Sequence, residues 1–66
     1  MKENLLFIRH ASSAGRTLAV FSDLQGGSDV VLSHEECQRR LDNLKDRDLP
    51  FEETEKALIN WPEHAD

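Results

Sequence analysis

The 66-residue sequence contains one cysteine, two prolines, three glycines and no tyrosine. A single cysteine, Cys37, excludes an internal disulfide, and His10, His34 and His64 are too widely scattered for a zinc motif. We therefore expect no metal and no other cofactor. A chain of this length buries only about 60% of its unfolded surface, so a protein partner or a homodimer is the remaining way to add stability.

Long apolar segments are also missing. No run of 18 apolar residues is present, and no charged start precedes a long apolar stretch. These absences argue against a membrane span and against a signal peptide. Together with the single cysteine, they predict a reduced, cytoplasmic protein that has no membrane partner.

The chain also has no excess of positive charge. The net charge is −5, and acids and bases cancel in residues 1–33, so the whole excess lies in residues 34–66, which hold ten acids and five bases. Such a surface repels nucleic-acid phosphates and attracts basic proteins. We expect no direct nucleic-acid binding. A surface that is acidic only for solubility is the alternative interpretation.

Three segments have the pattern of β-strands. Residues 12–15 read as a turn that joins a strand at 4–10 to an antiparallel strand at 16–22. A second loop at 23–29 contains two glycines, and residues 30–32 form a third strand, at an edge or beside the first. Alternation in the first strand is expected to place Leu5, Phe7 and Arg9 on one face and Leu6, Ile8 and His10 on the other.

A helix is expected after the third strand. Ser33 and Glu36 have the spacing of a capping box. Cys37, Leu41 and Leu44 then recur as a narrow apolar stripe that should lie on the sheet. The helix is expected to end near residues 46–48, before Pro50.

Pro50 is expected to lie near the start of a second helix of about eleven residues, which Pro62 ends. One face of it should hold Thr54, Ala57, Leu58 and Trp61. The sequence therefore predicts an α+β fold of order β-β-β-α-α, a three-stranded, mainly antiparallel sheet covered by one helix, with a second short C-terminal helix. Residues 1–62 are expected to form one domain and residues 63–66 a disordered tail.

The segment Leu5 to Ala11 ends in Arg9-His10, which is similar to the strand-end Arg-His signature of histidine phosphatases. In such enzymes this histidine becomes phosphorylated, and a second histidine and further arginines are needed to bind the phosphoryl group. Neither His34 nor His64 is expected to serve as that second group. We therefore interpret Arg9 and His10 as strand residues and expect no catalytic activity.

Cys37 follows His34 by three residues near a helix N-terminus, where the pKa of a thiol can be lowered. Its place in the apolar stripe instead predicts a small buried side chain. Gly26-Gly27-Ser28 lacks the lysine of a phosphate-binding loop and is interpreted as a turn.

Two motifs resemble the HicB-like antitoxin domain. Phe21-Ser22-Asp23-Leu24-Gln25-Gly26 occupies the place of the Phe-Pro-Asp-Leu-Pro-Gly strand end of that family, without its prolines. Ser33-His34-Glu35-Glu36-Cys37 occupies the place of its Thr-Leu-Glu-Glu-Ala helix start. The resemblance spans most of residues 4–45 and implies a non-catalytic protein that sequesters a small basic toxin. We expect no counterpart of the family's C-terminal DNA-binding segment, so a stand-alone role without autoregulation is an alternative to the antitoxin role.

The sequence thus predicts a small protein-binding module that neutralises or regulates a basic partner through an acidic helical surface. The alternatives are a phage or mobile-element inhibitor of a host enzyme and a minimal phosphatase-like protein that uses His10. The expected partner-binding residues are Phe51, Glu52, Glu53, Glu55 and Trp61.

Overall fold

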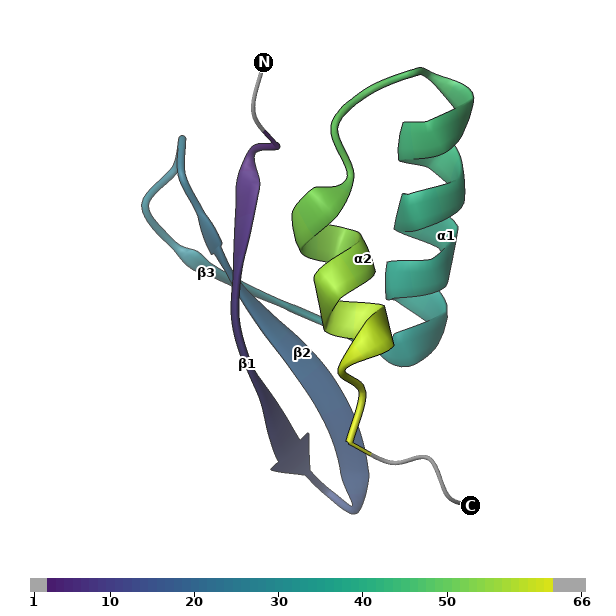
Figure 1. Cartoon of the computed structure of the whole chain (residues 1–66). Helices are drawn as coiled ribbons and strands as arrows, with labels where there is room; N and C mark the ends of the chain where they lie inside the picture. The colour runs from purple at the N-terminus through teal and green to yellow at the C-terminus, as the bar shows by residue number, and fades with distance from the viewer. Residues whose placement is uncertain (1–2, 63–66) are drawn as a thin grey trace.

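The computed structural model describes residues 3–62 of the chain. Strands β1 (Leu5–Ser13), β2 (Arg16–Asp23) and β3 (Asp29–Leu32) form an antiparallel sheet in the order β1-β2-β3, and helices α1 (His34–Asp46) and α2 (Glu52–Ile59) follow (Figure 1). The predicted α+β order β-β-β-α-α is confirmed. Of the two places predicted for the third strand, β3 takes the sheet edge, next to β2. The predicted tail at 63–66 lies outside the described residues.

The first hairpin is tighter than the predicted four-residue turn. Ser13 still pairs with Arg16, so only Ala14 and Gly15 connect the strands. Their φ angles are 52° and 76°, and positive φ at both central residues matches the twist of a two-residue hairpin. Gly15 adopts this conformation without a Cβ penalty, while Ala14 is held in it by the strands on either side.

A β-bulge overturns part of the predicted alternation in β1. Phe7 pairs with Phe21 but Arg9 pairs with Val20, so β1 carries one extra residue, Ile8. The extra residue reverses the side on which every later residue lies. His10 therefore faces the helices and Arg9 faces away from them, the opposite of the prediction.

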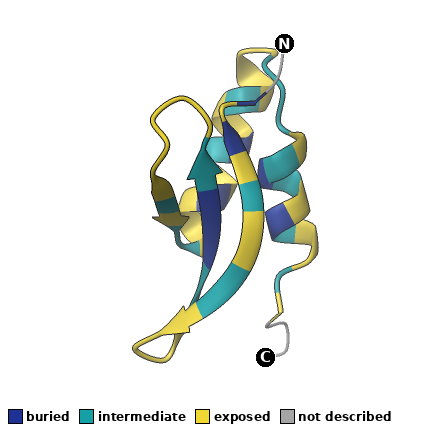
Figure 2. Cartoon of the chain, turned by 90° about the vertical axis from the view of Figure 1, so that its left-hand side faces the viewer, coloured by how far each residue is buried: buried dark blue, intermediate teal, exposed yellow. Residues whose placement is uncertain are grey.

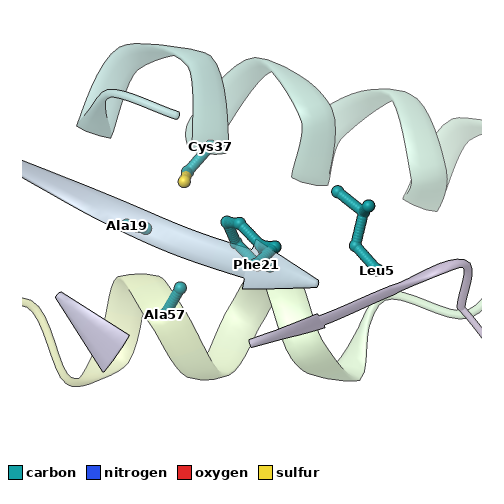
Figure 3. Packing of buried hydrophobic residues seen from close by; sticks show 5 residues of the cluster. All are labelled: Leu5, Ala19, Phe21, Cys37 and Ala57. Atoms are coloured by element: carbon teal, nitrogen blue, oxygen red, sulfur yellow. The ribbon is translucent and has the colours of Figure 1, made fainter. Parts of the chain in front are cut away.

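Both helices cover the same face of the sheet, whereas one covering helix was predicted. α2 lies beside α1 and packs on β1, and α1 packs on β2 and β3 (Figure 1). The core brings together side chains from both helices and two strands, and among residues 3–62 Phe21 is the largest side chain that is completely buried. Figure 3 shows this cluster of Leu5, Ala19, Phe21, Cys37 and Ala57.

The predicted capping box is present at the start of α1. The amide of Glu36 donates to the Ser33 hydroxyl at 3.1 Å, and the Glu36 carboxylate accepts from the Ser33 amide at 2.8 Å. The backbone hydrogen bond from Ser33 lowers the pKa of Glu36, because it favours the charged carboxylate. The stripe predicted for α1 is confirmed for Cys37 and Leu41, which are buried, while Leu44 is half-buried.

Helix α2 is shorter than predicted, with eight residues. Its last turn ends at Asn60, whose side-chain amide donates to the Lys56 carbonyl at 2.9 Å. This bond satisfies a carbonyl at the helix end. Trp61 therefore lies beyond the helix.

The other face of the sheet is open (Figure 2). Leu6, Ile8 and Val31 are 41%, 49% and 50% exposed, and Val20 lies buried between its strand neighbours. Among residues 3–62, neither helix has the length and apolar character needed to cross a membrane.

Candidate functional site

A hollow of about 380 Å³ lies beside the start of β1. It is bounded by the loop after β2 and by the segment that enters α2. Leu6 and Leu24, which are 41% and 56% exposed, form part of its apolar wall. Its lining residues are Glu3, Leu5, Leu6, Leu24, Pro50, Glu52 and Glu53. We call this the acidic hollow, because every charged side chain that lines it is a carboxylate.

Two of the five predicted partner-binding residues, Glu52 and Glu53, line the acidic hollow. Glu52 is exposed and lies in the first turn of α2. Phe51, Glu55 and Trp61 are half-buried and do not line the hollow. The structure therefore gathers only part of the predicted set into one site.

Phe51 lies under a basic side chain of α1. The Lys45 ammonium is 5.3 Å from the centre of the Phe51 ring, within the range of a cation–π interaction. This contact joins the segment before α2 to the last turn of α1. Phe51 thus stabilises the packing of the two helices.

Glu53 has a structural role that its sequence position does not reveal. Its carboxylate accepts the Phe7 amide of β1 at 3.0 Å and lies 3.3 Å from the Lys56 ammonium. Phe7 pairs with Phe21 at a position of the ladder where its amide points away from β2. Glu53 therefore covers a backbone donor at the outer edge of β1 and fixes α2 on that strand.

Glu3 organises the start of α2, and no sequence pattern pointed to it. This carboxylate is only 9% exposed. It accepts the Glu53 amide at 2.8 Å and the Thr54 hydroxyl, and Arg40 Nε lies 3.7 Å away. Phe51 at the helix start offers no side-chain cap, so a carboxylate from a distant part of the chain satisfies the amide instead. In the sequence, Glu3 is an acid directly before a predicted strand. Nothing in the sequence distinguishes it from an acid on the surface.

Trp61 lies against two histidines from different elements. Its ring centre is 4.8 Å from that of His10 and 4.9 Å from that of His34, both with edge-to-face geometry. His10 Nε2 is also 2.9 Å from the Ala57 carbonyl of α2. These contacts explain why the chain beyond α2 returns to the sheet, and Trp61 is one of the partly buried side chains that pack against the core.

The bulge in β1 also determines how the side chains of the Arg9-His10 motif are placed. Because of the bulge, His10 faces α2 while Arg9 is exposed on the opposite face. The two side chains are therefore not placed to bind one phosphoryl group.

Cys37 is completely buried against the sheet. Burial, with the Glu36 carboxylate as a second cause, raises the pKa of this thiol to about 11. The thiol is therefore protonated at neutral pH, which makes it a poor nucleophile and metal ligand.

We expect Cys37 in the folded protein to react with a small disulfide reagent at pH 8 about a hundredfold more slowly than the same thiol in urea, because its thiolate is rare and buried. Since its folded pKa is raised, its favourable contribution to stability is present below the ordinary pKa of about 9 and is lost as the pH rises through about 11. Stopped-flow thiol titration measures the first effect. A native rate equal to that in urea would contradict it.

Between residues 3 and 62, no cluster of three or more histidine, cysteine or carboxylate side chains could hold a metal ion. In comparisons with known proteins, no family model, no curated protein and no solved structure matches this chain.

Proposed function

We propose that this chain is a non-catalytic protein-binding module of antitoxin type, and that its partner is a basic protein that inserts a lysine or arginine side chain into the acidic hollow. The observation that carries the proposal is the hollow itself. It combines apolar walls with three carboxylates on a domain of net charge −5.

The walls suit the stem of a long basic side chain. Leu6, Leu24 and Pro50 offer apolar surface to its methylene groups, and long basic side chains bury their stems while the charged head stays near water or an acid. Exposed leucines beside a hollow are also typical of protein-binding surfaces. Shape and chemistry therefore favour the same kind of ligand.

The three carboxylates of the acidic hollow have different roles in this proposal. Glu3 and Glu53 are occupied by bonds that hold α2 in place, so their positions are rigid. Glu52 makes no such bond among the described residues and is exposed. It is therefore the carboxylate that meets the incoming charge, and the net negative field increases the rate of encounter.

The resemblance to HicB-like antitoxins supports the same class of partner, a small basic toxin. Its first motif is built here as a turn in which the Asp23 carboxylate accepts the amides of Gln25 and Gly26 at 3.0 and 3.1 Å. That turn carries Leu24 to the wall of the hollow. The motif thus shapes the proposed binding surface.

Replacing Glu52 with lysine is expected to weaken binding of a basic partner by at least about tenfold, because a repulsive charge replaces the free carboxylate. The tagged chain is used to capture small basic proteins from a host lysate at low and moderate salt. The affinity of a captured protein for wild type and variants is then measured by calorimetry.

The matched control is Asp42→Lys, which makes the same change in net charge at an exposed position of α1 outside the hollow. Leu24→Ser tests the apolar wall and leaves every charge in place. Equal losses in Glu52→Lys and Asp42→Lys would show that only net charge matters and would overturn the hollow as the binding site.

A further inference from the structure

A second and larger groove, of about 510 Å³, opens between α1 and the inner face of β3. Its apolar floor includes Val30 and Leu32 of β3, and Leu44 of α1 also lines it. Three arginines of the α1 segment line it, namely Arg39, Arg40 and Arg47, so three of the eight basic residues of an acidic chain meet here. One carboxylate, that of Glu36, also lines the groove and is bonded to the Ser33 amide. We call this the arginine groove.

The guanidinium of Arg40 is bonded through one of its nitrogens and can bind an anion through the other two. Its Nε donates to the Thr54 hydroxyl at 3.2 Å and lies 3.7 Å from the Glu3 carboxylate. Among the described residues, nothing accepts a hydrogen bond from its two terminal nitrogens, and the side chain is only 29% exposed. A guanidinium fixed at one side and open at the other is suited to a carboxylate, because little side-chain freedom is lost on binding.

The outer edge of β3 is open beside this groove. The Asp23 backbone amide donates to the Ser28 carbonyl at 2.8 Å. Because hydrogen-bonded and non-hydrogen-bonded pairs alternate along an antiparallel ladder, the backbone groups of Val31 point away from β2. At the other edge of the sheet, Glu53 covers the equivalent outward amide of Phe7. No described residue covers that of Val31.

The widths of the two layers also differ. Three strands span about 14 Å, whereas two packed helices with their side chains span about 20 Å. A helix layer of this width is expected to extend beyond the sheet, and the groove lies on the side where α1 packs on β2 and β3. One more strand would add about 5 Å to the sheet, which is close to this difference in width.

We propose that the arginine groove and the edge of β3 bind an extended, acidic and apolar segment of a protein partner, which adds to β3 as a fourth strand. Its backbone pairs with Val31. Its apolar side chains cover Val30 and Leu32, and its carboxylates reach Arg40 and Arg47. This site is independent of the acidic hollow and has the opposite charge preference.

The probe is a fluorescein-labelled, capped nonapeptide, Thr-Val-Thr-Glu-Thr-Leu-Thr-Glu-Thr, whose glutamates and apolar residues share one face of a strand. Fluorescence anisotropy is expected to show saturable binding to the wild type, about tenfold weaker when both glutamates are replaced by glutamine. Amide hydrogen exchange is expected to slow at Val31 when the peptide binds.

The decisive variant is Val31→Pro, because a proline whose missing N–H faces solvent at an edge keeps the ladder to β2 and blocks a fourth strand. Val31→Thr is the matched control, since it keeps the amide. Circular dichroism confirms that each variant folds. We expect Val31→Pro to abolish binding, Val31→Thr to bind as wild type, and Arg47→Gln to bind about fivefold more weakly.

No binding of the peptide to the folded wild type, or equal binding by Val31→Pro, would overturn the proposal. Sedimentation measurements of the oligomeric state test the alternative occupant, a second copy of the chain. A wild-type dimer that becomes a monomer in Val31→Pro, with no peptide binding, would assign this edge to a second copy of the chain.

Discussion

Replacing Phe21 with alanine is expected to lower the free energy of unfolding by about 4 kcal/mol, because it removes the largest completely buried side chain of the described residues. Phe21 lies on the central strand, with the Phe7 ring 5.7 Å away in edge-to-face contact. A domain of 66 residues has a total stability of about 3–10 kcal/mol. Urea denaturation followed by tryptophan fluorescence of Trp61 should show the unfolding midpoint of the variant at a much lower urea concentration than that of the wild type.

Phe21→Leu and Val31→Ala are the comparisons for this measurement. Leucine keeps most of the buried volume and should cost about 1–2 kcal/mol. Val31 is half exposed on the open face, so its truncation should cost under about 1 kcal/mol. If Phe21→Ala were as stable as Val31→Ala, the core would not depend on this ring.

The sequence predicted the elements that depend on local chemistry. The capping box of Ser33 and Glu36, the stripe through Cys37 and Leu41, and the glycine-marked turns each follow from a few neighbouring residues. These are the features that the structure confirms. Their physical causes act within one turn of helix or one hairpin, so they can be read from adjacent residues.

Features that depend on distant residues were not predicted. The bulge at Ile8 arises from the pairing of β1 with β2, which no pattern within residues 4–10 encodes. The second covering helix depends on where α2 docks, and eight residues with a weak apolar face do not specify this alone.

For the same reason, the acidic hollow contains only two of the residues predicted for partner binding. Glu52 and Glu53 belonged to that prediction because clustered acids at a helix start are visible in sequence. Glu3, Leu6 and Leu24 come from other segments and join the hollow only through the tertiary fold. The arginine groove is also a tertiary feature, since its floor is on β3 and its charges are on α1.

Glu3→Ala is expected to lower the free energy of unfolding by about 3 kcal/mol, a large part of the total, although the residue precedes the first strand. The change leaves the Glu53 amide and the Thr54 hydroxyl without their acceptor and Arg40 without its nearest carboxylate. Unpaired buried donors each cost about 1–3 kcal/mol, and partial exposure of Arg40 moderates its share. Urea denaturation measures the loss, and hydrogen exchange should show α2 opening before the sheet.

Glu35→Ala is the control, because it removes another glutamate–arginine pair, at 3.4 Å from Arg39, in which both side chains are mostly exposed. Its cost should stay below about 1 kcal/mol. Glu3→Gln keeps the shape and one acceptor oxygen, so its stability should fall between wild type and Glu3→Ala. A Glu3→Ala variant as stable as Glu35→Ala would mean that α2 does not depend on this carboxylate. Because Glu3 and Glu53 also line the acidic hollow, loss of α2 docking should weaken binding of a basic partner even where Glu52 is intact.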